Sequence, residues 1–317
     1  MKFLFSIGGI SILFFGFTFR QSALPTHSVF IKSTDRLYYI MQRDKSFNNN
    51  ILFKFIDNMP ELRKRIPTGE YILDEKENTY TFLLKLFSGS FVRHKITFPE
   101  GLTVHQIIER LKQNTILTGS INSIPKEGSI MPDTYFYKFG DTRQDIINRM
   151  RDEMNKFKKQ VQNENKTDLT WNKIVTLASI IELEAGDSKN RALISSVFHN
   201  RLKKGMRLES DMTVIYALTV NGEYKGTIDR KHILHKDLFV KSPYNTYRNS
   251  GLPPAPICCP GRASIKAAIH PADTKFLFFI ADINTGEVFY SDNLKQHNKY
   301  RSEIKNSQRY AKQQNMK

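Results

Sequence analysis

Two acids interrupt an otherwise apolar run at residues 178–186, which read ASIIELEAG. Burying a carboxylate without a partner costs free energy, so Glu182 and Glu184 need a functional or a structural reason. Desolvation in an apolar helix raises the pKa of a carboxyl group, and a group that keeps its proton near neutral pH can serve as a general acid. The structural alternative is one acid paired with a basic residue and a second acid at the surface.

The elements predicted to position these acids are two consecutive helices. The first covers residues 171–185, follows Thr170 as an N-cap residue and stops at Gly186, which tolerates the left-handed backbone of a helix end. The second ends at Gly205. Residues two apart on a helix point about 200° away from each other, so the two acids are predicted to face nearly opposite sides and not to cooperate.

The composition indicates a folded and strongly basic protein. Hydrophobic residues make up 40% of the 317 residues, enough for a sizeable core, which excludes a disordered chain. The net charge of +17 favours an anionic partner: nucleic acid, anionic lipid headgroups or a polyanionic polymer. The two cysteines are adjacent, Cys258 and Cys259, and no histidine stands at ligand spacing, so we expect buried apolar side chains, with no disulfide, metal or cofactor.

An uncharged apolar run covers residues 3–19, between Lys2 and Arg20. Its length lies at the short end of the ~17–25 residues that cross a bilayer as a helix, which predicts a transmembrane anchor over residues 1–20. The alternative is a cleaved signal peptide, but the sequence QSA at 21–23 matches a small-x-small cleavage site poorly. Basic residues follow the run, so charge alone does not fix its orientation.

Short strands and amphipathic helices are predicted to alternate over residues 28–157. Residues 29–43 and residues 96–110 both read as a strand, a turn and an amphipathic helix, either as an internal repeat or as ordinary alternation. Residues 78–89 predict a helix that ends at a glycine. A charged helix is predicted over 141–162, and the overlapping polar stretch 158–170 indicates a loop or interdomain hinge.

Two later segments, residues 199–218 and 241–282, are rich in Tyr, Asn, Ser, Gly and Pro, a composition typical of a polar cleft. Together with ASIIELEAG they resemble the MltG (YceG-like) family of endolytic transglycosylases, which cut nascent peptidoglycan strands at the inner membrane. The resemblance covers nearly the whole chain from about residue 28. The motifs that carry it occur in the family's order: TGEY, ITFPEG, EGSIMPDTYFY, ASIIELEAG, FHNRLKKGMRLESDMTVIY, SPYNTY, GLPPAPI and FFIADINTGEVFYSDNLKQHN.

The resemblance implies that Glu182 is the catalytic acid. It implies an α+β fold: the anchor, an α/β region over 28–157 with a LysM-like peptidoglycan-binding unit around ITFPEGLTVHQIIERL, and a catalytic domain over 168–312 in which the helical hairpin carries the acid. Alternatives stay open for Asn200, as a capping or ion-pairing residue, and for the NTY sequence, as a tight turn. The residues implied to bind substrate are Glu184, Asn200, Ser210, Asp211, Tyr244, Asn245, Thr246 and Tyr247.

The implied reaction cleaves the β-1,4 bond between N-acetylmuramic acid and N-acetylglucosamine, leaves a 1,6-anhydro end and terminates glycan elongation. An ordinary retaining glycosidase needs a second carboxylate about 5 Å from the first, which one helix with opposed acids does not offer. A lytic transglycosylase instead uses the C6 hydroxyl of the muramic acid as its nucleophile. Glu182 would then act first as an acid and afterwards as a base.

The implied partners are glycan strands, membrane lipid around the N-terminal helix, and peptidoglycan synthases. The implied location is the bacterial inner membrane, with a cytoplasmic N-terminus and an extracytoplasmic catalytic domain. A membrane-tethered scaffold that binds glycan without cutting it would share the anchor, charge and LysM-like unit. Nucleic acid is disfavoured, because no helix-turn-helix, zinc finger, RNP motif or phosphate loop occurs. Departures from the family pattern leave the subsite shapes open: Glu209, Met212, Ala255 and Glu287.

Overall fold

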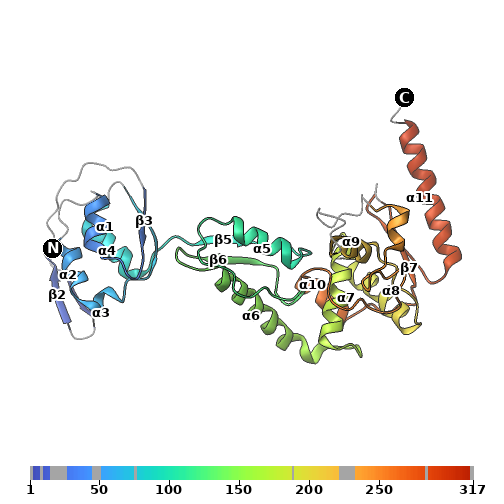
Figure 1. Cartoon of the computed structure of the whole chain (residues 1–317), viewed down its shortest axis with the longest axis horizontal. Coiled ribbons are helices and arrows are strands. Elements are labelled where there is room, and N and C mark those ends of the chain that lie inside the picture. Colours follow the sequence, from blue (N-terminus) through green and yellow to red (C-terminus); the bar gives the residue numbers. More distant parts are fainter. Residues whose placement is uncertain are drawn as a thin grey trace. The chain divides into compact units, whose positions relative to one another are not determined.

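The computed structural model describes residues 3–7, 10–14, 27–44, 51–74, 77–187, 189–220, 233–282 and 285–314. It is a mixed α+β structure, mostly helical, with small two-stranded sheets, which confirms the predicted α+β class (Figure 1). The chain forms two compact units. Unit 1 holds Met1–His94 and Phe136–Asp141, and unit 2 holds Lys95–Tyr135 and Thr142–Lys317. The division after His94 differs in place from the predicted boundary between 157 and 168, and the predicted domain limits stay predictions.

In the described part of unit 1, four helices pack with the antiparallel strand pair of residues 27–31 and 69–73. Alternate residues of the two strands point into its core, where Ile31 and Tyr71 are fully buried together with Phe53 and Phe82 from two of the helices. Alternating burial is what an antiparallel pair with one covered face produces. The elements are β3 (His27–Ile31), α1 (Leu37–Asp44), α2 (Ile51–Asp57), α3 (Pro60–Arg63), β4 (Gly69–Leu73) and α4 (Thr79–Ser88).

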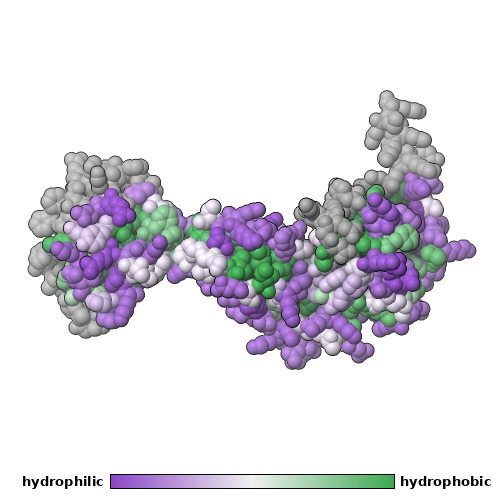
Figure 2. Space-filling model, in the orientation of Figure 1, coloured by the Kyte–Doolittle hydropathy of each residue, from purple (hydrophilic) through white to green (hydrophobic). Residues whose placement is uncertain are grey.

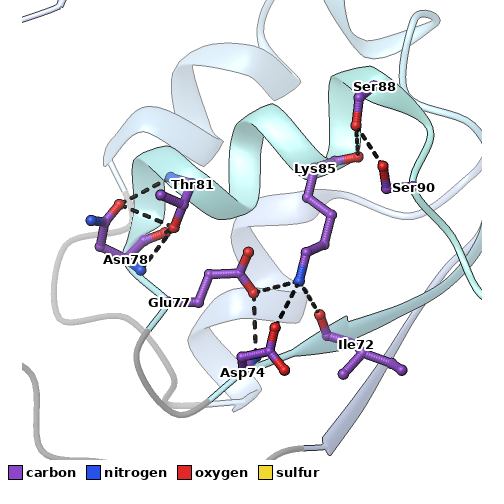
Figure 3. Close-up of polar contacts among 8 residues, drawn as sticks. All are labelled: Ile72, Asp74, Glu77, Asn78, Thr81, Lys85, Ser88 and Ser90. Atoms are coloured by element: carbon purple, nitrogen blue, oxygen red, sulfur yellow. Dashed lines mark hydrogen bonds and ion pairs between the residues drawn. The ribbon is translucent and has the colours of Figure 1, made fainter.

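Helix α4 is fixed at both ends by side chains that the sequence places locally (Figure 3). Asn78 accepts a hydrogen bond from the Thr81 N–H at 2.9 Å, and the Thr81 hydroxyl accepts one from the Asn78 N–H at 3.1 Å. The Lys85 amine donates to the Ile72 carbonyl at 2.7 Å and so ties the helix to β4. The helix ends at Gly89, whose φ is +68°, which confirms the prediction for residues 78–89.

The two segments predicted as strand, turn and helix both have that order. In the first, β3 leads into α1, and in the second β5 (His94–Thr97) leads into α5 (Val104–Gln113). Their pairing differs, because β3 pairs with β4 whereas β5 pairs with β6 (Thr134–Tyr137). The strand–turn–helix order is therefore confirmed, and a LysM-like binding function for the second segment stays a prediction.

The described part of the predicted anchor consists of strands. Phe3–Ile7 (β1) and Ile10–Phe14 (β2) pair antiparallel. Ile and Phe are common in strands, and each glycine of the intervening pair disfavours a helix by about 1 kcal/mol. We find no helix of membrane-spanning length and apolarity in the described parts of the chain. The rest of residues 1–20 lies outside those parts, and the membrane anchor stays a prediction.

Unit 2 is built around α7 (Trp171–Glu184), which packs against α8, α9 and α10. All residues from Ile174 to Ile181 are buried, as predicted for the apolar first helix of a hairpin.

The second predicted helix is α8, and the charged helix predicted over 141–162 is α6, which continues into the stretch predicted as a hinge. The visible surface is mainly hydrophilic, with smaller hydrophobic patches (Figure 2). The other elements are α6 (Arg143–Val161), η1 (Gln162–Glu164), α8 (Arg191–Lys203), α9 (Asp211–Val220), η3 (His235–Phe239), α10 (Arg262–Ile269), β7 (Phe278–Ala281), β8 (Val288–Ser291) and α11 (Leu294–Gln314).

Candidate active site

Glu182 lies in the last turn of α7 and is held by two donors from other elements. Its side chain is only 6% exposed. Oε1 accepts a hydrogen bond from Arg191 Nη2 at 3.1 Å, and Oε2 accepts one from the Gly261 backbone N–H at 2.8 Å. A carboxyl group with one charged and one backbone donor has a fixed orientation, which a group that transfers a proton in a defined direction requires.

Arg191 begins α8 and connects three helices. Its Nε donates to the Ser264 hydroxyl of α10 at 3.0 Å, while its Nη2 faces Glu182 of α7. The Arg191 side chain is 16% exposed and Ser264 is fully buried. Because the guanidinium is rigid and planar, these two contacts fix its position in the site.

Glu100 brings a second carboxyl group to the same place. The backbone of the FPEGL turn runs along that of the CCPG segment: the Gly101 N–H donates to the Cys259 carbonyl at 3.0 Å, and the Cys259 N–H donates to the Leu102 carbonyl at 2.8 Å. This pairing lays the Glu100 side chain against Gly261, where a Cβ would overlap the carboxyl group. Glu100 Oε2 lies 3.8 Å from Arg191 Nη2. Sequence reasoning missed Glu100, although it stands in the ITFPEG motif.

The charges around Glu100 act on its proton affinity in opposite directions. Desolvation raises the pKa of the Glu100 carboxyl group above its ordinary value, and the negative charge of Glu182 raises it further. The positive charges of Arg191 and Arg262 lower it, and the negative charge of Asp133 raises it. Two carboxyl groups that share one guanidinium thus influence each other's charge.

Glu184 points to another part of the unit, as its position two residues after Glu182 predicts. Its Oε1 accepts a hydrogen bond from the Ser210 hydroxyl at 2.6 Å, and the Ser210 N–H donates to the Thr246 hydroxyl at 3.0 Å. The neighbouring Glu209 has a φ of 53°, unusual for a residue other than glycine, and pairs with Arg201 Nη1 at 3.1 Å. The two acids of the ASIIELEAG motif therefore have separate partners.

The remaining predicted binding residues take part in loop structure. The amide of the fully buried Asn245 donates to the Leu238 and Val240 carbonyls at 3.0 and 2.9 Å, and Thr246 is buried beside it. These are the contacts expected for the tight-turn alternative. The amide of Asn200 likewise donates to the Thr274 carbonyl at 2.8 Å and to the Phe276 carbonyl at 3.0 Å. Contact of these side chains with a glycan stays a prediction.

Two tyrosines of the SPYNTY motif are also anchored within the protein. The Tyr247 hydroxyl donates to Asp211 Oδ1 at 2.7 Å, which joins the motif to the first turn of α9. The Tyr244 ring meets the Tyr216 ring edge-on, with 4.9 Å between their centroids. Tyr244 packs against the hydrophobic core and remains partly exposed.

The adjacent cysteines are free and fully buried, which confirms their prediction as small apolar residues. Burial raises the pKa of both thiols well above the ordinary value. Cys259 lies 3.6 Å from Oε1 of Glu127, which also accepts the Val104 N–H at 2.9 Å. Burial raises the pKa of Glu127 to about 7. This carboxyl group caps α5 and was not predicted from the sequence.

The fold therefore presents a helical hairpin whose first helix ends in a buried, oriented glutamate, with a second carboxyl group beside the same arginine. The chain belongs to the YceG-like family, whose model matches residues 31–303. It is similar to the endolytic murein transglycosylase of Bacillus subtilis, with 40% identity over 232 residues that cover 72% of this chain and 59% of the relative. The corresponding protein of Streptococcus pneumoniae (strain D39) is 29% identical over 66% of this chain and 41% of its own length.

A solved structure shows the same fold. The crystal structure of a yceG-like protein from Listeria monocytogenes matches 87% of this chain and 99% of its own, with a TM-score of 0.55 and 32% sequence identity. The alignments of the chain thus span about three fifths and two fifths of the length of the Bacillus and Streptococcus relatives.

Proposed function

We propose that this protein is an endolytic lytic transglycosylase that cleaves the bond between N-acetylmuramic acid and N-acetylglucosamine in nascent peptidoglycan strands and so terminates their elongation. The observation that carries the proposal is the placement of Glu182, buried and oriented by Arg191 and the Gly261 N–H at the end of α7. Relatives named endolytic murein transglycosylases support the substrate class.

In the proposed reaction Glu182 gives one proton to the leaving group and then takes another from the nucleophile. Protonated Glu182 donates to the bridging oxygen as the bond from that oxygen to C1 of the muramic acid breaks, and the glucosamine leaves with a new O4 hydroxyl. The C6 hydroxyl oxygen of the muramic acid then bonds to C1, and the proton of that hydroxyl passes to Glu182, which is protonated again. The nucleophile belongs to the substrate, so its attack benefits from proximity, and no water is consumed.

The other side chains of the site have supporting parts in this proposal. Arg191 and the Gly261 N–H keep the Glu182 carboxyl group in one orientation through both proton transfers. The Ser210 hydroxyl holds Glu184 on a different side of the helix, where that acid anchors the hairpin to the segment before α9. Tyr244, with its partly exposed ring, is the residue of the SPYNTY motif best placed to contact a sugar.

We further propose that the chain is attached to the bacterial inner membrane through residues 3–19, with unit 2 on the extracytoplasmic side and peptidoglycan synthases as partners. The uncharged apolar run supports attachment. The net charge of +17 suits a surface that faces anionic headgroups and the carboxylates of stem peptides.

One observation favours a second candidate, a glycan-binding scaffold without catalytic activity. Glu182 forms an ion pair with Arg191, as expected for an acid with a purely structural role. Mass spectrometry of glycan strands incubated with the full chain separates the candidates. New 1,6-anhydro ends support the transglycosylase, new reducing ends indicate a hydrolase, and intact strands that remain bound indicate a scaffold. A Glu182→Gln variant is the control for contaminating activity.

A further inference from the structure

The ion pair between Glu182 and Arg191 raises a chemical problem for the proposed function. A guanidinium beside a carboxyl group stabilises the carboxylate form, whereas a general acid must carry a proton when the substrate binds. Their atoms are only 3.1 Å apart, and the pair is shielded from water, since the two side chains are 6% and 16% exposed. Some other group must offset the charge of Arg191 if Glu182 is to donate a proton.

Glu100 is placed to offset that charge. It comes from the turn before α5, far from α7 in the sequence, yet it reaches the same guanidinium nitrogen, Arg191 Nη2, at 3.8 Å. Both carboxyl groups also meet at Gly261: Glu182 accepts its N–H, and Glu100 occupies the space where a Cβ would stand. The absence of a side chain at this one residue lets the two acids approach the same arginine.

We propose that Glu100 is a positioning residue of the catalytic site: by sharing Arg191 with Glu182, it neutralises the guanidinium and allows Glu182 to hold the proton that the reaction needs. This inference rests on the proposed function and adds a second acid to it. Glu100 acts through Arg191 and does not transfer the proton itself. When the proton returns to Glu182 at the end of the cycle, Arg191 remains balanced by the Glu100 carboxylate.

Charged groups from four other segments face Glu100. These groups are Glu182 on α7, Arg191 on α8, Arg262 on α10 and Asp133 before β6. Arg262 is already engaged, because its Nη1 pairs with Asp133 at 2.5 Å and its Nη2 pairs with Glu153 at 3.1 Å. Arg191 is therefore the cation that Glu100 and Glu182 divide between them, and a proton on one of the two acids relieves their repulsion.

A pH profile of turnover tests the proposal. In Glu100→Gln, Glu182 is the one acid left beside Arg191, so the guanidinium stabilises the Glu182 carboxylate more strongly. We expect the alkaline limb of the kcat/KM profile to move to lower pH by about one unit, and turnover above that limb to be about tenfold slower. Glu100→Asp keeps the charge and should leave the limb nearer to its wild-type position. Glu164→Gln is the matched control, because Glu164 is 49% exposed, close to the 43% of Glu100, but pairs with His270. If the alkaline limb of the kcat/KM profile stays at the same pH in Glu100→Gln, the proposal is wrong.

A second measurement needs no glycan and stands even if the wild-type protein cleaves nothing. The carboxyl carbon of Glu100 can be titrated by ¹³C NMR, with Glu100→Gln used to assign its signal. In Glu182→Gln the like charge is gone and Arg191 is released, and both changes should lower the midpoint of Glu100. A midpoint that stays the same in a folded Glu182→Gln variant shows that the two acids are not coupled, and it refutes the inference independently of the reaction type.

Discussion

Replacing each acid of the ASIIELEAG motif by glutamine should affect the protein in different ways. In Glu182→Gln the side chain keeps its shape but has one acceptor oxygen where the glutamate has two. Arg191 and the Gly261 N–H both donate to Glu182, so one of these buried donors loses its acceptor. We expect a loss of about 1–3 kcal/mol in the free energy of unfolding. The variant should still fold and bind glycan.

The loss of turnover in Glu182→Gln should be much larger than its loss of stability. General acid–base assistance contributes about 10²–10⁴ to a rate, and here one residue supplies both the acid and the base, so the decrease should reach about 10⁴ or more, or at least 5 kcal/mol in the activation barrier. In Glu184→Gln an amide oxygen can still accept from the Ser210 hydroxyl, so we expect less than about a tenfold loss of turnover.

The assay measures 1,6-anhydro product by mass spectrometry and the melting temperature of both variants. Near-normal turnover in Glu182→Gln, with an inactive but folded Glu184→Gln, would reverse the two roles. Full activity in both variants would place the catalytic acid outside this motif.

Three further predictions concern other parts of the chain. Gly261 has a φ of −78°, which alanine adopts freely, so Gly261→Ala should act only by displacing the flexible Glu100 carboxyl group. Turnover should fall about tenfold. In a double-mutant cycle, the same substitution in a Glu100→Ala background should cause no further loss. Burial raises the pKa of Glu127 from its ordinary value of 4.5 to about 7, so the folded state holds a proton that the unfolded state releases. The free energy of unfolding should therefore decrease by about 3 kcal/mol as the pH rises between these two values, and urea titrations of Glu127→Gln should lack this slope. The mature chain should begin at Met1 or Lys2 and stay with membranes after a high-salt wash, whereas a soluble form that begins near Leu24 would show cleavage.

The helical hairpin could be predicted because its signals are local. A run of apolar residues predicts α7, and the helical period alone separates Glu182 from Glu184. The predicted end signals differ from the structure, because Thr170 makes no side-chain cap hydrogen bond, the C-cap residue is Ala185, and Gly186 does not adopt the left-handed backbone. The apolar N-terminal run shows the limit of such reasoning. Isoleucine and phenylalanine are compatible with both an apolar helix and a strand, and residues 3–7 and 10–14 form a strand pair.

The partners of Glu182 could not be derived from the sequence, because tertiary contacts supply them. The Gly261 N–H lies 79 residues away along the chain, and Glu100 approaches from the other direction. The turn glycine after Glu100 stands in the ITFPEG motif, whereas the glycine before α10 lies in the polar segment 241–282. Nothing in the sequence indicates that these two segments pair through their backbones. For Asn245 and Thr246, polar composition suggested a cleft, but their hydrogen bonds stabilise a turn.

The backbone pairing of the FPEGL turn with the CCPG segment decides where the chain can be shortened. A fragment that begins at residue 168 would retain the whole ASIIELEAG helix, yet it would lose the hydrogen bonds that Gly101 and Leu102 make with Cys259. It would also remove the Glu127 contact of the buried Cys259 and leave Arg191 without Glu100. Such a fragment should be prone to aggregate and to oxidise at its cysteines. The smallest autonomous catalytic piece should therefore start near Lys95, where unit 2 begins.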